Sequence, residues 1–163
     1  MNKQAVDLAE KVHRLFREKG LTLSVAESCT GGLISHYLTA LPGASTFFLG
    51  GVVAYSEEVK NDLLGVSPDA IFHSGLVSRE TALEMAEKVR LLLKTDCSLS
   101  ATGNLGPDVL EGKEQGLVYI AANKHDATMS KELRLKGDRE ANKEETSLSA
   151  LRLLIELVEQ KDE

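Results

Sequence analysis

The segment Ala26-Glu27-Ser28-Cys29-Thr30-Gly31-Gly32 separates two patterns of different period and decides the fold of this chain. Leu21, Leu23 and Val25 precede it as an apolar run typical of a strand, and a helical pattern starting at Leu33 follows it. A strand that turns through small polar residues and glycines into a helix leaves a hydroxyl or thiol at the carboxyl edge of a sheet, beside free backbone N–H groups. The segment therefore predicts a nucleophile next to an anion site. The same residue types also end strands and cap helices, so a plain structural turn is the alternative.

Length, composition and charge limit the classes of protein to which the chain can belong. Its 163 residues, 42% hydrophobic and 27% charged, are typical of one globular domain over residues 1–163. The net charge of -6 argues against nucleic-acid binding, which needs clustered positive charge, but is compatible with one anionic metabolite. No apolar run approaches the roughly 20 residues that span a bilayer, and the N-terminus lacks the layout of a signal peptide. We therefore expect a cytoplasmic, soluble protein without a membrane or nucleic-acid partner.

Residue types that bind metals or activate a serine are sparse. The two cysteines, Cys29 and Cys97, stand in no metal-ligand spacing, so no metal site is expected. Cys29 beside Ser28 fits either a reactive thiolate or a small core residue, and we favour the core. The four histidines lie in helical patterns, after an apolar pair or in a turn, which favours structural or solvent-exposed roles for His13, His36, His73 and His125.

Helical and strand patterns alternate along most of the chain. Helices are expected over residues 5–16 with a stop at Gly20, over 31–40, 57–65 and 78–94, and around the closing stripe 148–158. Strands are expected over residues 21–26, 46–55, 97–102, 116–123 and 128–136, with a long irregular segment over 103–115. In the second strand, Gly50-Gly51 marks a bulge or a close backbone approach. This order predicts an α/β fold, a three-layer α/β/α sandwich around a mixed, mostly parallel sheet with an appended antiparallel hairpin.

Polar side chains follow the ends of the first three expected strands. Ser28 follows the first strand, Tyr55 and Lys60 follow the second, and Thr102 ends the third. If these strands are parallel, their carboxyl ends meet at one edge of the sheet, which is where ligands bind in such folds. We therefore expect these four residues to converge.

The converging groups predict a serine–lysine hydrolase of amide or ester bonds. A serine attacks a carbonyl only when a base takes its proton, and Lys60 can do so if burial or a cationic neighbour lowers its pKa from about 10.4 toward neutrality. Tyr55 would hold Lys60 or relay a proton, and N–H groups near Thr30-Gly31-Gly32 would stabilise an oxyanion. Arg139, near the start of the last helix, suits a bidentate phosphate contact. The structural alternatives are a helix cap for Ser28 or Thr30, a surface ion pair with Glu57 for Lys60, packing for Tyr55 and an ordinary turn for Arg139.

Taken together, the chain resembles the C-terminal domain of the competence/damage-inducible protein A family, in the stand-alone form that acts as a nicotinamide mononucleotide deamidase. The similarity runs from the first helix to the last. It is carried by Ala26-Glu27-Ser28-Cys29-Thr30-Gly31-Gly32, Gly43-Ala44-Ser45-Thr46-Phe47-Phe48, Tyr55-Ser56 with Lys60, Gly75-Leu76-Val77-Ser78, Thr102-Gly103 with Gly106-Pro107, and Gly137-Asp138-Arg139. The resemblance implies hydrolysis of the nicotinamide amide to nicotinic acid mononucleotide and ammonia in pyridine nucleotide recycling, with neither metal nor organic cofactor.

The resemblance also assigns roles to residues. Ser28 matches the nucleophile and Lys60 its base, with Tyr55 as a further catalytic-site group. Tyr55 and Ser45 match polar groups that line the same pocket, Thr102 matches the hydroxyl residue at the end of the third strand, and Arg139 matches an arginine expected near the nucleotide phosphate. The expected substrate-binding residues are Thr30, Gly31, Gly32, Ser45, Thr102, Gly103, Asn104 and Arg139.

One region departs from the family pattern, which reads Ser/Thr-Gly-Ile-Ala-Gly-Pro followed by more glycine. Asn104 and Leu105 replace the Ile-Ala pair, and Asp108-Val109-Leu110-Glu111 replaces the glycines. Bulkier, more acidic residues in a substrate loop would narrow the pocket or repel a phosphate. Two alternatives therefore stand beside the deamidase: a related amide or ester hydrolase with another substrate, and a non-catalytic nucleotide-binding or competence-associated module. The expected partner is a small nucleotide, and the expected assembly is a homo-oligomer, in the first place a dimer.

Overall fold

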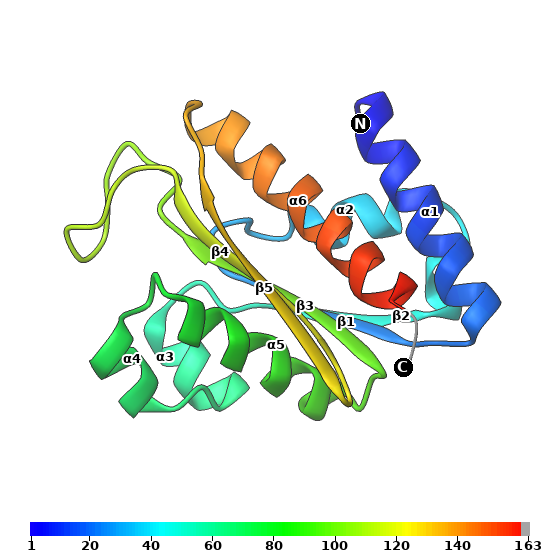
Figure 1. The fold of residues 1–163 in the computed structure, drawn as a ribbon, viewed down its shortest axis with the longest axis horizontal. Coiled ribbons are helices and arrows are strands. Elements are labelled where there is room, and N and C mark those ends of the chain that lie inside the picture. The colour runs from blue at the N-terminus through cyan, green and yellow to red at the C-terminus, as the bar shows by residue number, and fades with distance from the viewer. Residues whose placement is uncertain (161–163) are drawn as a thin grey trace.

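The computed structural model describes residues 1–160 and contains a five-stranded mixed sheet between two layers of helices (Figure 1). The strands are β1 (Leu23–Glu27), β2 (Phe48–Val53), β3 (Cys97–Gly103), β4 (Leu117–Lys124) and β5 (Ala127–Arg134). Their order across the sheet is β2-β1-β3-β4-β5. β1 pairs in parallel with β2 and β3, whereas the β3–β4 and β4–β5 pairs are antiparallel. The predicted α/β/α sandwich with a terminal hairpin is confirmed.

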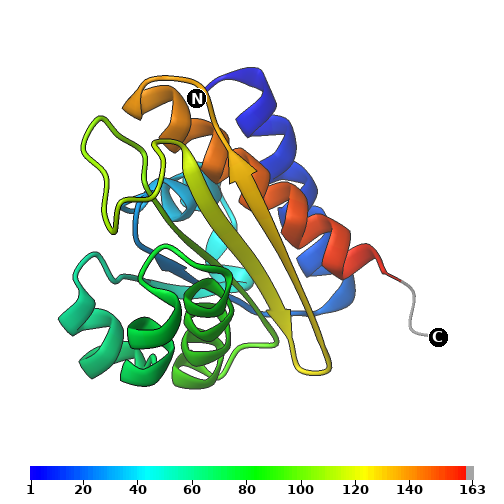
Figure 2. The same cartoon turned by 60° about the vertical axis from the view of Figure 1, so that its left-hand side comes forward.

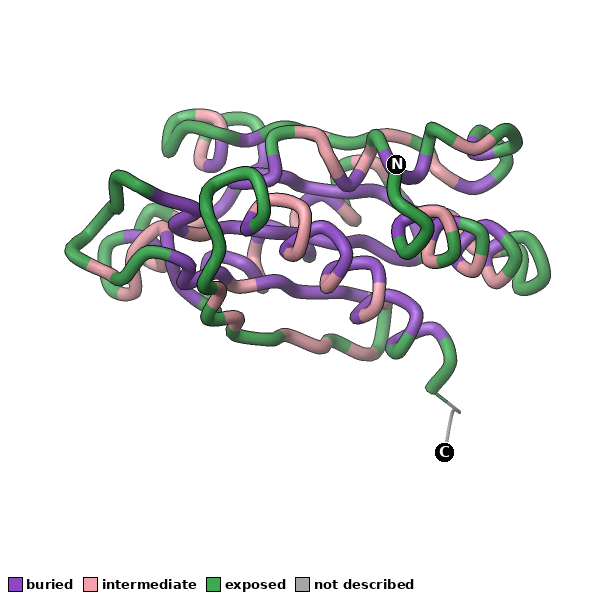
Figure 3. The backbone as a smooth tube through the Cα atoms, turned by 90° about the horizontal axis from the view of Figure 1, so that it is seen from above, coloured by how far each residue is buried: buried purple, intermediate pink, exposed green. Residues whose placement is uncertain are grey.

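The helices lie in two groups on opposite faces of the sheet (Figures 1 and 2). One face is covered by α1 (Lys3–Lys19), α2 (Leu33–Thr39) and α6 (Arg139–Glu159). The other face carries α3 (Glu57–Val59), the π-helix η2 (Lys60–Leu64), α4 (Pro68–Ser74) and α5 (Arg79–Leu93). A short 3₁₀ turn, η1 (Ala44–Thr46), leads into β2. Figure 3 shows the buried central strands between the more exposed outer surfaces of these layers.

β3 is buried on both faces, and its two faces differ in chemistry. Leu99 belongs to the larger apolar core, which the sheet shares with α1, α2 and α6. On the other face, the hydroxyls of Ser98 and Ser100 donate hydrogen bonds to the carbonyls of Ala86 and Ala82 in α5. Small polar side chains therefore allow α5 to pack closely on the strand without leaving the hydroxyls unsatisfied.

The main departures from the predicted elements lie at turns. α2 begins only after Gly31 and Gly32, because both residues take a positive φ, 59° and 108°. β2 is shorter than predicted because Ala44–Thr46 forms η1 instead of extended chain. No helix is predicted over Pro68–Ser74, where the structure has α4. Its start signal was present in the sequence, since Ser67 caps the helix and Pro68 is its first residue.

A β-bulge and a close backbone approach both occur at Gly50 and Gly51, as their position in the second strand suggests. The register between β1 and β2 skips one residue, because Leu23 pairs with Phe48 and the next residue pairs with Gly50. A Cβ atom on Gly51 would lie 2.9 Å from the Ser35 hydroxyl of α2. That hydroxyl donates to the carboxylate of Glu27, so it is not free to move away. The Ser35 side chain of α2 therefore packs directly on the backbone of β2 at Gly51.

Replacing Gly51 with Ala should lower the free energy of unfolding by about 1–3 kcal/mol, because the added methyl overpacks the contact with Ser35. Gly50→Ala is the matched control, since its Cβ would lie 3.4 Å from the flexible Leu93 side chain and should change stability by no more than about 0.5 kcal/mol. Urea unfolding of both variants measures the difference. Equal stabilities would contradict the close packing of α2 on β2.

Candidate active site

The amine of Lys60 lies against the hydroxyl of Ser28 at the carboxyl edge of the sheet, with 2.8 Å between Nζ and Oγ. Ser28 follows β1, and Lys60 begins η2 after the end of β2. The same Nζ donates to the carbonyls of Ala54 at 2.8 Å and Tyr55 at 3.2 Å. Ser28 is 8% exposed and Lys60 only 2%. The parallel strands thus bring together the serine and the lysine that the sequence singles out.

An unusual turn of helix presents Lys60. Ser56 caps α3 by accepting a hydrogen bond from the N–H of Val59, and the chain then widens into the π-helix η2, which ends at Gly65. Wide turns of this kind are rare and occur frequently at functional sites. Lys60 is the first residue of the wide turn, and its side chain extends to the end of β1.

Burial is the main cause that lowers the pKa of Lys60, to about 8. A neutral amine has two N–H bonds and one lone pair. The carbonyls of Ala54 and Tyr55 can accept both N–H bonds, which leaves the lone pair facing Ser28. In this form Lys60 accepts a hydrogen bond from the Ser28 hydroxyl. The arrangement is that of a serine with a general base.

Burial has the opposite effect on the neighbouring thiol and raises the pKa of Cys29 to about 12. Cys29 is 7% exposed and belongs to the larger apolar core. The thiol is therefore protonated at neutral pH, as expected for a core cysteine and not for a reactive thiolate. Burial likewise raises the pKa of Cys97 to about 11.

The turn that carries Ser28 is held by the carboxylate of Glu27, a residue to which the sequence reading assigns no role. Glu27 is 1% exposed. It accepts hydrogen bonds from the N–H groups of Gly32, Ile34 and Ser35 and from the Ser35 hydroxyl. Because Gly32 has no side chain to cap α2, Glu27 caps this helix from the preceding strand. The sequence signal that could have revealed this cap is an acidic residue at the end of a strand, just before a helix.

The predicted oxyanion donors need a correction. The N–H of Gly31 donates to the carbonyl of Ser28, and that of Gly32 donates to Glu27, so neither is free for a substrate. The N–H groups of Cys29 and Thr30 make no bond to another backbone group within residues 1–160. Cys29 lines the cavity over Ser28 and Thr30 does not, so the N–H of Cys29 is the backbone donor that the turn leaves beside Ser28.

A cavity with a volume of about 240 Å³ opens over the pair, and we call it the Ser28 cavity. The predicted site residues that line it are Ser28, Tyr55, Lys60, Thr102, Gly103, Asn104 and Arg139. Thr30, Gly31 and Gly32 do not line it. Ser45 lies in η1 at the amino end of β2, so the structure does not bring it together with Ser28.

Tyr55 and Arg139 meet at the cavity, but Tyr55 does not contact Lys60 through its ring. Its backbone carbonyl accepts the Lys60 hydrogen bond, whereas its hydroxyl accepts one from Arg139 at 3.0 Å. The other end of the Arg139 guanidinium donates to the carbonyl of Gly106 at 2.8 Å. Tyr55 thus holds Lys60 by its main chain, and its hydroxyl, on a residue that is 59% exposed, is bonded to Arg139 and not to Lys60.

Two predicted binding residues direct their side chains at the protein backbone. The Thr102 hydroxyl donates to the carbonyl of Leu76. The amide of Asn104 donates to the carbonyls of Leu110 and Lys113 and accepts from the N–H of Leu110. They shape the cavity rather than offering free polar groups to a ligand. Leu105, Asp108, Val109 and Leu110 also line the cavity, and they belong to the loop in which the sequence departs from the family pattern. The lining residues to which sequence reasoning assigns no site role are Cys29, Leu76 and Val77.

Residues 1–160 contain no group of three or more His, Cys, Asp or Glu side chains placed to hold a metal ion. Over the same residues, no helix combines the length and apolar character needed to cross a membrane.

Comparison with known proteins identifies the family. The family model described as the CinA C-terminal domain matches residues 5–158. This chain belongs to the CinA C-terminal domain family. A CinA-like protein of Dictyoglomus turgidum is 47% identical to this CinA domain over 149 residues, which are 90% of this chain and 36% of that protein. The chain spans about a third of the length of the curated relatives that it matches.

Solved structures share the whole fold of this CinA domain. The competence or damage-inducible protein from Enterobacter asburiae superposes with a TM-score of 0.93 at 31% identity, over 96% of this chain and 99% of that one. The competence/damage inducible protein CihA from Agrobacterium tumefaciens gives a TM-score of 0.93 at 33% identity, over 98% of each chain. The family resemblance read from the sequence is confirmed.

In this CinA domain, Glu27→Gln should lower the free energy of unfolding by at least about 2 kcal/mol, because the amide replaces one acceptor oxygen with a donor that faces N–H groups. The exposed Glu58, in the first turn of α3, is the matched control, and Glu58→Gln should change stability by no more than about 0.5 kcal/mol. Urea unfolding measures both variants. A Glu27→Gln variant as stable as the control would rule out the capping role.

Proposed function

We propose that this CinA domain hydrolyses the amide of nicotinamide mononucleotide to nicotinic acid mononucleotide and ammonia, with Ser28 as nucleophile and Lys60 as its base. The observation that carries the proposal is the contact between a buried, low-pKa amine and a buried serine hydroxyl. The choice of substrate rests on the resemblance of the chain to the stand-alone deamidases of the family. Arg139 in the same cavity supports an anionic ligand.

The first half-reaction forms an ester between the substrate and Ser28. The neutral amine of Lys60 takes the hydroxyl proton while the Ser28 oxygen attacks the amide carbon. The carbonyl oxygen becomes an oxyanion, for which the N–H group of Cys29 is the available backbone donor. The Lys60 ammonium then returns its proton to the amide nitrogen, the C–N bond breaks, and ammonia leaves.

The second half-reaction releases the acid. Lys60, neutral again, takes a proton from a water molecule as that water attacks the ester carbon. The proton then passes from Lys60 to the Ser28 oxygen as the ester bond breaks, which restores the serine and yields the carboxylic acid, and this acid loses its remaining proton to water to give the carboxylate. Because Lys60 acts as base and then as acid in each half, a pKa of about 8 suits it better than the usual value for a lysine.

Removing the nucleophile should abolish turnover. Ser28→Ala should lower kcat for ammonia release from nicotinamide mononucleotide by about 10³-fold or more, because Ser28 acts in the transition state. The assay is run with a chelator present, and Ser149→Ala, a serine on α6 that does not line the Ser28 cavity, serves as control. Full activity of Ser28→Ala would contradict the mechanism, and an inactive but folded wild-type protein would contradict the substrate.

The pH dependence tests Lys60. The active form is the neutral amine, so kcat/KM should rise with pH through an apparent pKa of about 8 and level off above it. The second ionisation of the substrate phosphate, near pKa 6, lies below this range. Initial rates of ammonia release from about pH 6.5 to about 9.5 give the profile. A flat profile would exclude Lys60 as the base.

One observation favours a second candidate, the same hydrolysis on an amide that lacks the phosphate. Asp108 lines the Ser28 cavity together with Arg139, so a carboxylate shares the space of the arginine. The two candidates differ in the ratio of kcat/KM for nicotinamide mononucleotide and for its dephosphorylated nucleoside. A ratio well above one supports the nucleotide, and a ratio below one supports the second candidate. Ligand-induced stabilisation without ammonia release would instead indicate a binding module.

A further inference from the structure

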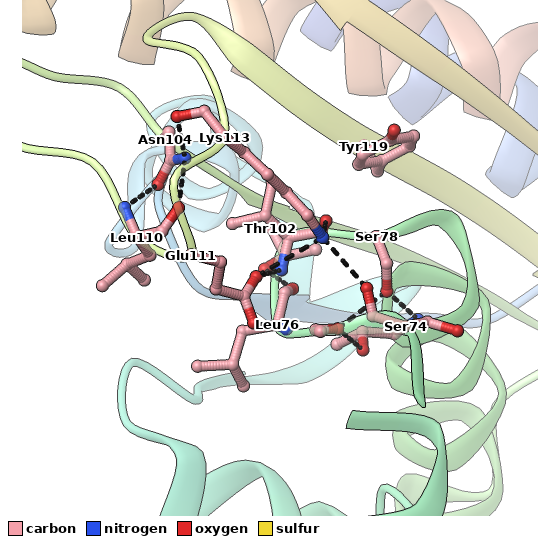
Figure 4. Close-up of polar contacts among 12 residues, drawn as sticks. Ser74, Leu76, Ser78, Thr102, Asn104, Leu110, Glu111, Lys113 and Tyr119 are labelled. Carbon is pink, nitrogen blue, oxygen red and sulfur yellow. Dashed lines mark hydrogen bonds and ion pairs between the residues drawn. The ribbon is translucent and has the colours of Figure 1, made fainter. Parts of the chain in front are cut away.

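We infer that Glu111 and Lys113 position one wall of the Ser28 cavity and thereby set how tightly the substrate is bound. Neither residue lines this cavity, and neither contacts Ser28 or Lys60. The kinetic consequence rests on the proposed function, whereas the positioning role itself does not. Figure 4 shows the contacts from which the inference is drawn.

The carboxylate of Glu111 binds the backbone of the segment between α4 and α5. Its two oxygens accept hydrogen bonds from the N–H of Leu76 at 2.8 Å and the N–H of Val77 at 2.9 Å (Figure 4). Leu76 and Val77 both line the Ser28 cavity. Glu111 therefore holds two lining residues by their main chain while its own side chain stays outside the cavity.

Lys113 binds the carbonyls of the same segment. Its Nζ donates to the carbonyl of Ser74 at 2.9 Å and to that of Val77 at 2.6 Å. It also forms an ion pair with Glu111, with 3.5 Å between Nζ and Oε1. The two side chains thus complement the donors and acceptors of one short stretch of backbone. We call Glu111 and Lys113 the clasp.

The clasp joins two segments that are distant in sequence and that both contribute to the cavity. The segment 74–78 supplies Leu76 and Val77, and the irregular loop 104–116 supplies Leu110. These lining side chains are apolar, which suits the face of an aromatic ring. The position of this apolar wall therefore depends on how closely the loop 104–116 is held to the segment 74–78.

The apolar core backs this wall only in part, since Leu76 packs against a core cluster and Val77 belongs to none of the clusters. Val77 and Lys113 also line a second, more polar cavity of about 370 Å³, together with Ser78 and Tyr119. Val77 therefore lies between two cavities, although it is only 1% exposed. The hydrogen bonds and the ion pair of the clasp add a restraint on its main chain to the packing of its side chain.

The backbone on both sides of the clasp takes conformations that few residues tolerate. Glu111 has a φ of 61°, in the left-handed region that residues other than glycine seldom adopt. Gly75 has a φ of 93°, and a Cβ atom there would lie 2.6 Å from the Glu111 carboxylate. Such local strain persists where surrounding contacts over-determine it, and it often lies at ligand sites.

Other contacts hold each segment when the clasp is removed, so the variants should fold. The Thr102 hydroxyl bonds to the carbonyl of Leu76, and the buried Asn104 amide bonds to the loop at Leu110 and Lys113. The Ser28–Lys60 contact depends on β1 and η2, which the clasp does not touch. Loss of the clasp should therefore loosen the wall and leave the reacting groups in place.

The test uses Glu111→Gln and Lys113→Met, which keep side-chain size and remove the charge. KM for nicotinamide mononucleotide should rise about tenfold in each, while kcat stays within about twofold, because the wall contributes binding and not transition-state chemistry. In the double variant KM should rise no further than in the single variants, since the two residues act as one clasp. Unchanged KM values, or a fall in kcat as large as the fall in kcat/KM, would overturn the inference.

Matched controls come from exposed ion pairs nearby. Glu114 lies on the same loop and pairs with Arg134, and Lys131 pairs with Glu156. Glu114→Gln and Lys131→Met each remove one charge outside the clasp and should leave KM and kcat unchanged. A rise in KM in these controls equal to that in the clasp variants would show that overall charge, and not the clasp, sets binding, and would overturn the inference.

Hydrogen–deuterium exchange gives a readout that does not need activity. Deuterium uptake over 74–78 and 105–110 should rise in both clasp variants relative to wild type, and not in Glu114→Gln. If the wild-type protein releases no ammonia, the proposed function fails while the exchange data still decide the positioning role. Unchanged uptake in the clasp variants would overturn that role whatever the activity.

Discussion

The burial of the Lys60 amine is the constraint on which the rest of the site depends. A buried ammonium is costly unless it is paired, and no carboxylate within residues 1–160 forms an ion pair with Lys60. Its partners are two carbonyls and one hydroxyl, all of which a neutral amine also satisfies. The site therefore lowers the cost of losing the proton instead of stabilising the charge. A carboxylate paired with Lys60 would instead have raised the pKa of the amine and kept it protonated, so that it could not act as a base.

Glu27 explains why the glycine turn does not act as the sequence suggests. The N–H groups at the start of α2 form a ready anion site, but the protein supplies its own anion from the residue before Ser28. That carboxylate fixes the turn and so fixes Ser28 against Lys60. Of the N–H groups that precede the helix, it leaves that of Cys29 as the backbone donor beside Ser28.

The part of the site that sequence could predict is the part that follows from strand direction. Parallel strands place their carboxyl ends together, so Ser28, Lys60 and Thr102 were expected at one edge without knowledge of any side-chain angle. What could not be predicted is which atom of each residue faces the cavity. Tyr55 holds Lys60 by its carbonyl and not by its hydroxyl. Ser45, which only the resemblance assigned, lies at the opposite end of β2 because strand length separates the two edges.

The long loop could be recognised from sequence as irregular, but not as organised, since its order comes from contacts with distant residues. Two of its departures from the family pattern, Asn104 and Glu111, are the residues that organise it.

The acidic side chains of this loop do not all face the cavity. The sequence raises the concern that an acidic loop repels a phosphate, but the Glu111 carboxylate is engaged by two N–H groups and Lys113 and lies outside the cavity. Among the loop's acidic residues that replace glycine, Asp108 alone lines the cavity, where Arg139 carries the opposite charge. The single carboxylate of Asp108 and the single guanidinium of Arg139 carry opposite charges that offset each other. Under the proposed function, discrimination between phosphorylated and unphosphorylated amides would depend on whether Arg139 exchanges its bonds to Tyr55 and Gly106 for bonds to the ligand.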